Sequence, residues 1–262
     1  LAPPKVEQPD WTAHPAYIWS GGAVRSLDHL AAQPLELLTG INSQKEALHA
    51  NVHRHASGFP AHDVLLWGAR GMGKSALVKS VVADLQEKGM EIALIQAQVD
   101  RPDSLAGLFT ALGKVDRPFL LFFDDIGFDG DGNSDGQVGA RALRSLLDGG
   151  AMARPVNVRL AVTSNRRAIV ERQMREQDDP VNPRDTLDDR LALADRFGLS
   201  LGFHNCGQDD FLAIISGYAA VHGLTFDEAD ALRWAHQRGH RSGRIAWHYV
   251  VELAGRAGKT LA

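Results

Sequence analysis

Residues 67–79, WGARGMGKSALVK, place three glycines around a lysine and a serine directly after an apolar run. The part from Gly68 to Ser75 matches the pattern G-x-x-x-x-G-K-[ST] at every fixed position. Backbone N–H groups converge on phosphate oxygens only where no Cβ blocks their approach, which explains the glycines. Lys74 would add a positive charge toward the β- and γ-phosphates, and the Ser75 hydroxyl would bind Mg²⁺. The predicted phosphate-binding residues are Gly68, Ala69, Arg70, Gly71, Met72, Gly73, Lys74, Ser75 and Ala76.

The flanking sequence supplies the strand and the helix that such a loop needs. DVLLW (63–67) is typical of a strand, and apolar residues after Ser75 recur on one face of a helix. The N-terminus of that helix would point its positive dipole end at the phosphates. The alternative is a flexible turn with an exposed lysine. That alternative does not require a strand and a helix on either side, so the context favours phosphate binding.

Two aspartates, Asp124 and Asp125, follow the apolar run FLLFF (119–123). An uninterrupted apolar run of this length is typical of a strand buried on both faces of a parallel sheet. Ligands of parallel sheets bind at the carboxyl ends of the strands, where these two side chains are placed. Asp124 would hold Mg²⁺ through its water shell, and Asp125 would polarise an attacking water. The alternative is that the pair caps the next turn.

Strand-like and helix-like segments alternate from about residue 35 onward. The expected strands are 63–67, 91–96, 118–125, 156–165 and 199–203, and the expected helices are 44–55, the segment after the glycine loop as far as Gly89, 103–113 and 137–148. Such alternation predicts an α/β fold in which helices cover both faces of a parallel sheet.

The sequence divides into three regions. Residues 1–34 show no sustained period and are predicted to form an irregular extension, whose aromatic residues we expect to pack on the rest of the chain rather than on a partner. Residues 35–207 form the predicted nucleotide-binding core. Residues 208–262 contain three helical patterns with no strand between them, which predicts a small helical lid.

Composition restricts the function classes only weakly. A net charge of −4 and a pI near 6.3 give no support to an extended nucleic-acid surface, so DNA binding is possible but not favoured. The single cysteine, Cys206, cannot form an internal disulfide, which favours a reducing compartment. The apolar runs are too short to cross a bilayer. We therefore expect a cytoplasmic protein with no membrane partner, although a chain that begins at Leu1 leaves a removed targeting segment open.

The glycine loop and the aspartate pair resemble those of the AAA+ ATPases, and further segments support the resemblance. TSN (163–165) is similar to the sensor 1 segment, which implies that Asn165 orients the attacking water or contacts the γ-phosphate. LDDRLALADRFGL (187–199) resembles the arginine-finger segment of bacterial replication initiators. By that likeness Arg196 enters the nucleotide site of a neighbouring subunit, with Arg190 as a second candidate.

Two other segments extend the resemblance to the lid and to the residues before the glycine loop. HRSGR (240–244) is similar to the sensor 2 motif, which implies that Arg244 contacts the γ-phosphate from the lid. LLTGINSQKEAL (37–48) resembles the segment that lies against adenine, near Gly40 and Ile41. More narrowly, the chain resembles an uncharacterised family of bacterial AAA+-like ATP-binding proteins. The resemblance implies ATP and Mg²⁺ as cofactors, a nucleotide-dependent homo-oligomer and a protein client.

Two departures from the AAA+ pattern leave alternatives open. Most hydrolytic members have glutamate where this chain has Asp125, and a shorter side chain at that position favours slow hydrolysis or a nucleotide-gated switch. The stretch QVDRPDSLAGL (98–108) lacks the aromatic residue with which threading unfoldases grip polypeptide. The leading hypothesis is an ATPase that couples nucleotide state to assembly or remodelling of a client. The alternatives are a switch with negligible hydrolysis, a DNA-associated loader and a small-molecule kinase.

Overall fold

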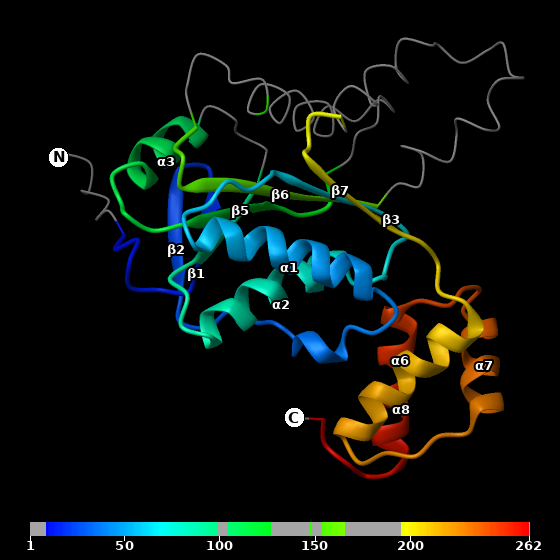
Figure 1. The fold of residues 1–262 in the computed structure, drawn as a ribbon. Helices are drawn as coiled ribbons and strands as arrows, with labels where there is room; N and C mark the ends of the chain where they lie inside the picture. The colour runs from blue at the N-terminus through cyan, green and yellow to red at the C-terminus, as the bar shows by residue number, and fades with distance from the viewer. Residues whose placement is uncertain (1–8, 99–103, 127–146, 148–153, 166–194, 262) are drawn as a thin grey trace, which may run out of the picture.

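A seven-stranded, mostly parallel sheet forms the centre of the molecule (Figure 1). The computed structural model describes residues 9–98, 104–126, 147, 154–165 and 195–261. The strands follow the order β2-β1-β4-β5-β6-β3-β7, and each pair is parallel except β1 with β2. Their bounds are β1 Ala16–Ser20, β2 Ala23–Leu27, β3 Val64–Gly68, β4 Ala93–Ala97, β5 Phe119–Phe123, β6 Val158–Ser164 and β7 Leu199–Phe203. The predicted α/β fold is confirmed.

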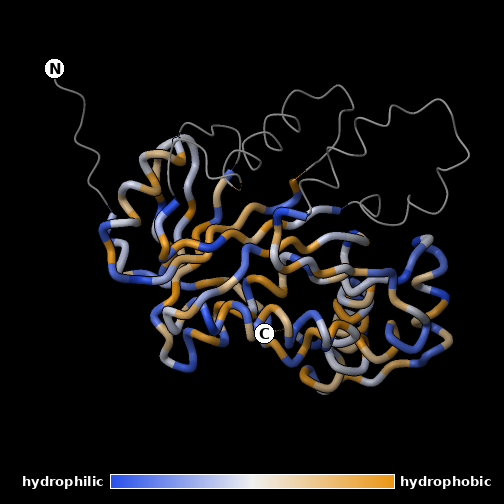
Figure 2. Tube along the Cα trace, turned by 45° about the horizontal axis from the view of Figure 1, so that its top comes forward, coloured by the Kyte–Doolittle hydropathy of each residue, from blue (hydrophilic) through white to orange (hydrophobic). Residues whose placement is uncertain are grey.

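Helices cover both faces of the sheet. On one face lie α1 (Asn42–Ala56) and α2 (Lys74–Glu87), which pack on each other, and α3 (Ser104–Leu112) lies on the other face (Figure 1). Every residue of β5 is buried, and its side chains alternate between the two hydrophobic clusters that these helices close. Figure 2 shows hydrophobic residues concentrated along the central strands. The apolar run before Asp124 is therefore a strand buried on both faces, as predicted.

The N-terminal region corrects one prediction, because residues 16–27 form a β-hairpin rather than an irregular extension. Strand β1 pairs with β4 in parallel and with β2 in antiparallel, so this hairpin completes one edge of the sheet. Gly21 and Gly22 connect the two strands with φ of 59° and 95°. A Gly-Gly pair between two short strands is a hairpin signal, and it could have been recognised in the sequence. As expected, the aromatic residues are buried on the chain's own core.

The C-terminal region consists of three helices with no strand between them. They are α6 (Gln208–Val221), α7 (Glu228–Gln237) and α8 (Gly243–Arg256). Helices α6 and α8 pack on each other, and α6 also contacts the short 3-10 helix η1 (Leu35–Leu37) that precedes α1. Among the helices of the described residues, none combines the length and the apolar character that a membrane span requires. Except for residue 147, the predicted helix 137–148 lies outside the described residues.

Candidate functional site

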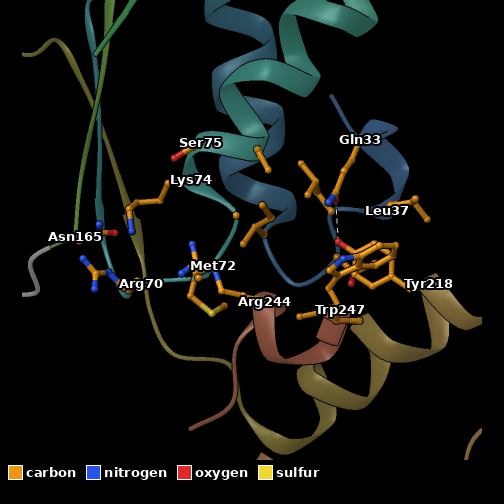
Figure 3. Close-up of a pocket in the computed structure, with 18 of the residues that line it drawn as sticks. Gln33, Leu37, Arg70, Met72, Lys74, Ser75, Asn165, Tyr218, Arg244 and Trp247 are labelled. Atoms are coloured by element: carbon orange, nitrogen blue, oxygen red, sulfur yellow. Dashed lines mark hydrogen bonds between the residues drawn. The ribbon is translucent and has the colours of Figure 1, made fainter. Parts of the chain in front are cut away.

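A pocket of about 450 Å³ lies between the sheet and the C-terminal helices. Figure 3 shows Arg70, Lys74 and Asn165 at one end of it and Tyr218 and Trp247 at the other. The pocket therefore has a polar end next to the carboxyl ends of β3, β5 and β6, and an aromatic end formed by α6 and α8. The lining residues are Gln33, Leu37, Leu38, Thr39, Ile41, Arg70, Gly71, Met72, Gly73, Lys74, Ser75, Ala76, Asp124, Asp125, Asn165, Ile214, Tyr218, Gly243, Arg244 and Trp247.

The glycines of the loop 68–75 have distinct local roles. Gly71 and Gly73 adopt φ of 77° and 86°, a region that L-residues rarely occupy, and both line the pocket. Gly68 has φ of 119° and lies against β7, where an added Cβ would come within 2.1 Å of the Phe203 carbonyl oxygen. The sequence assigned Gly68 and Ala69 to phosphate binding, but both lie outside the lining of the pocket. In this structure Gly68 allows the close approach of β3 and β7.

Lys74 is the buried cation of the pocket. Its side chain is 5% exposed, and its Nζ donates to the carbonyl oxygens of Gly68 (2.9 Å) and Ala69 (2.8 Å). Burial lowers the pKa of Lys74 to about 8, although the nearby carboxylates of Asp125 and Asp124 partly oppose that shift. Two other cations of the pocket, Arg70 and Arg244, lower this pKa further. An anion bound at this end of the pocket would stabilise the charged form of the lysine.

Ser75 and Asp124, the two residues assigned to Mg²⁺, are in direct contact. The hydroxyls of Ser75 and Thr163 both donate to Asp124 Oδ1, each at 2.6 Å. Because β5 pairs with β6 and β6 with β3, the residues that follow these parallel strands share one edge of the sheet. A hydroxyl beside a carboxylate fits Mg²⁺, which binds hard oxygen ligands and keeps several waters and phosphate oxygens in its shell. Ser75 and Asp124 are therefore the residues that would hold this ion.

Asp125 makes a backbone hydrogen bond, a side-chain hydrogen bond and an ion pair. Its backbone has φ of 56°, a left-handed conformation that aspartate tolerates better than most residues. Its amide N donates to Thr163 Oγ1 at 2.8 Å, and its carboxylate accepts a hydrogen bond from the Asn165 side-chain amide. Arg70 Nη2 lies 3.8 Å from Asp125 Oδ2, an exposed ion pair that contributes little to stability. Asp125 and Asn165, the two residues assigned to the attacking water, therefore lie in direct contact.

The C-terminal helices contact the glycine loop directly through the start of α8. The backbone N of Arg244 donates to the Gly71 carbonyl oxygen at 3.1 Å. Ser242 is the N-cap of α8 and is buried, and its Oγ accepts from the Ile245 N at 3.3 Å. An added Cβ on Gly243 would lie 3.3 Å from the same Gly71 oxygen. The sequence SGR thus brings α8 against the loop and places Arg244 in the lining of the pocket.

Sequence reasoning missed the aromatic end of the pocket. The Tyr218 hydroxyl donates to Gln33 Oε1 at 2.8 Å, and the rings of Tyr218 and Trp247 have centroids 5.1 Å apart (Figure 3). Burial raises the pKa of the Tyr218 hydroxyl, so it remains a hydrogen-bond donor at neutral pH. Of the two residues assigned to adenine, Ile41 lines the pocket, whereas Gly40 lies outside the lining, where an added Cβ would be 3.8 Å from Asp210.

Arg196 lies outside the lining of this pocket. It is exposed in the turn before β7, next to the amino end of that strand, whereas the glycine loop follows the carboxyl end of β3. Strands β3 and β7 are parallel, with Val64 opposite Leu199 and Gly68 opposite Phe203. The two sites are therefore separated by at least the length of a five-residue strand, roughly 16 Å. The second candidate, Arg190, lies outside the described residues.

Comparisons with known proteins agree with this architecture. The profile of a family described as "Protein of unknown function (DUF815)" matches residues 12–257, whereas no curated protein matches the chain. The Thermotoga maritima RuvB Holliday junction branch migration motor is 19% identical with a TM-score of 0.54, and the match covers 88% of this chain and 68% of that chain. The Aeropyrum pernix Orc1 protein in complex with DNA is 14% identical with a TM-score of 0.56, over 88% and 67% of the two chains.

A third solved structure, the Aeropyrum pernix ORC2 protein in ADPNP–ADP complexes, is 17% identical with a TM-score of 0.50, over 84% of this chain and 65% of that chain. At these identities the likeness concerns the fold. The chain therefore shares its fold with these RuvB, Orc1 and ORC2 structures.

Proposed function

We propose that this chain, which belongs to the DUF815 family, is an ATP-binding protein that hydrolyses ATP slowly and couples its nucleotide state to assembly or remodelling of a protein client. One observation carries the proposal. A single pocket joins a glycine loop, a buried lysine and a Ser75–Asp124 pair at one end to an aromatic wall at the other. The polar end suits a triphosphate, and the aromatic end suits a nucleobase. A small anion alone would fill only the polar end and would leave the aromatic wall without a contact.

Each residue of the polar end has a specific proposed role. Lys74 leaves the two carbonyl oxygens and binds phosphate oxygens, and backbone N–H groups of the glycine loop surround the same phosphates. Mg²⁺, held by Ser75 and Asp124, would neutralise charge on the β- and γ-phosphates. Arg244 contributes a permanent positive charge from α8. Closure of the helical unit, about residues 208–262, over the core at 35–207 then excludes water from the pocket.

Asp125 and Asn165 are proposed to act on the water that attacks the γ-phosphate. Asp125 accepts a proton from the attacking water, and Asn165 orients that water. The contact between these two side chains in this structure leaves Asp125 turned toward Asn165 and Arg70. Release of Asp125 from that contact is therefore a step that precedes hydrolysis. A carboxylate that must first be released supports the second candidate function, a nucleotide-gated switch with negligible turnover.

Arg196 supports a homo-oligomer. Arg196 precedes the amino end of β7, whereas the glycine loop of the same chain follows the carboxyl end of the parallel strand β3. Arg196 would therefore reach a γ-phosphate only in a neighbouring subunit. A planar, permanently charged donor is well suited to that position. Nucleotide bound between subunits would couple hydrolysis to the geometry of the assembly.

The oligomer is tested by the dependence of turnover on protein concentration. For the native chain we expect the rate per subunit to rise with concentration, because each site needs the Arg196 of a neighbour. Arg196→Ala should lower the rate at high concentration by tenfold or more and leave ATP affinity within about twofold. Arg25→Ala, an exposed arginine of β2, is the matched control. A native rate per subunit that is independent of concentration contradicts the shared site.

A further inference from the structure

The segment 233–248, RWAHQRGHRSGRIAWH, is the most basic part of the described chain. It contains four arginines and three histidines and no aspartate or glutamate. The whole chain has a net charge of −4, so the remaining residues carry −8 on the same count. The segment spans the end of α7, the turn 238–242 and the start of α8. This acidic protein therefore carries a local excess of positive charge around the turn that joins α7 to α8.

Two arginines of this turn are not neutralised within the part of the chain that the structure describes. Arg233 and Arg256 pair with Asp230, each at 3.1 Å. In contrast, no described carboxylate lies within ion-pair distance of Arg238 or Arg241, and both are exposed. Arg244 lines the pocket at the glycine loop instead. Arg238 and Arg241 are thus available to an external anion.

The turn holds Arg238 in place. Its guanidinium carbon lies 3.3 Å from the centre of the Trp234 ring, and its Nη1 donates to the Trp234 carbonyl oxygen at 3.4 Å. The His240 ring nitrogen Nδ1 lies 3.1 Å from the Arg238 carbonyl oxygen. Gly239 allows the tight turn with φ of 78°. A cation fixed before binding loses little conformational entropy when an anion arrives.

A cavity of about 370 Å³ lies next to the turn. Its lining residues are Asn205, Cys206, Ala235, His236, Gly239, His240 and Arg241. Besides the Cys206 thiol, the polar side chains among them are an amide, two imidazoles and a guanidinium, all of which can donate hydrogen bonds to phosphate oxygens. Burial raises the pKa of the Cys206 thiol, and the charge of Asp210 in α6 raises it further, but Asp210 lies outside the lining of the cavity. The chemistry of the cavity therefore suits a phosphate group.

The surroundings favour a nucleic acid over a membrane or a protein. The large exposed hydrophobic side chains among the described residues are Phe59, Val156, Val221 and Val251, and none belongs to the turn. Interfacial membrane segments and protein interfaces bury apolar surface, which this turn does not offer. A phosphodiester backbone needs only fixed cations and donors. We propose that the α7–α8 turn binds the phosphate backbone of a nucleic acid through Arg238 and Arg241, with one phosphate in the adjacent cavity.

The test is fluorescence anisotropy of the full chain, without nucleotide, with a labelled 30-nucleotide single strand and with a duplex of the same length. We expect affinity to fall as NaCl rises from 50 to 200 mM. Each lost phosphate contact removes about 0.7 (single strand) or 0.9 (duplex) from the slope of log K against log salt. Arg238→Gln/Arg241→Gln should therefore flatten the slope by roughly 1.4 or 1.8 and weaken binding at least tenfold at 100 mM salt.

The control Arg25→Gln/Lys114→Gln removes the same charge from exposed positions on β2 and after α3, and should bind like the native chain. Thermal unfolding verifies that both variants are folded. If both double variants lost the same affinity for the oligonucleotide, the loss would reflect net charge rather than the position of the arginines, and the proposal would be overturned. Native protein that does not bind either oligonucleotide would also overturn it. So would salt-dependent self-association that the double variant abolishes without any oligonucleotide binding, because the occupant would then be a second copy of the chain.

Discussion

Lys74→Met is expected to weaken ATP binding by at least a hundredfold. The substitution keeps the aliphatic stem but removes a buried cation that would donate to phosphate oxygens. Hydrogen bonds to charged groups contribute about 1.5–3 kcal/mol each, so loss of two of them corresponds to a hundredfold or more. Isothermal titration of the native and variant chains with ATP and Mg²⁺ measures the difference.

The same lysine predicts how affinity depends on pH. The pKa of Lys74 falls from its ordinary value of 10.5 to about 8 because the side chain is buried. Phosphates bind the protonated form and therefore raise this pKa again. Below pH 8 the lysine already carries its proton, so affinity should be flat with respect to this group. Above pH 8 binding must take up a proton, and affinity should fall by up to about tenfold per pH unit.

Lys79→Met, on the same helix but outside the pocket, is the matched control and should bind ATP like the native chain. The control should also show the native decline in affinity above pH 8, which the weak residual binding of Lys74→Met should lack. Tight binding of ATP by Lys74→Met would show that the phosphates lie elsewhere.

Asp125→Glu is expected to raise the rate of ATP hydrolysis by about ten- to a hundredfold. The added methylene moves the carboxylate by roughly 1.5 Å, and misplacement of that size costs about two orders of magnitude in rate. Affinity for ATP should change little, because Asp125 acts on the water. Single-turnover and steady-state rates separate the two quantities.

Asp125→Asn is the control for this comparison. It preserves size and tolerates the φ of 56°, but it cannot accept a proton, so binding should persist while hydrolysis stops. An unchanged rate in Asp125→Glu would show that the native aspartate is already well placed. That result would contradict a switch kept slow by its side-chain length.

The polar end of the site could be predicted from the sequence because its geometry is local or follows from strand order. Gly68 to Ser75 form one continuous loop. Asp124 and Asn165 follow parallel strands whose carboxyl ends share an edge, so a correct strand prediction brings them together. Ser75 and Asp124 are separated by 49 positions in the sequence, yet the order of the parallel strands is enough to predict their contact.

The aromatic end could not be predicted, because it depends on packing between distant segments. Gln33 and Tyr218 are separated by 185 positions, and their hydrogen bond exists only because α6 packs on η1. In the sequence, Tyr218 and Trp247 are ordinary apolar residues of amphipathic helices. The β1–β2 hairpin was missed for a related reason. Its five-residue strands are too short for a clear period, and β1 joins the sheet by pairing with β4, which lies more than 60 residues further along the chain.

Calorimetric titration of the native chain with ATP, with and without Mg²⁺, tests the central claim most directly. A triphosphate between Lys74 and the Ser75–Asp124 pair predicts one site per chain, with affinity that falls when EDTA removes the metal. The absence of binding heat under both conditions, over a temperature range that excludes a chance zero enthalpy, would contradict the account.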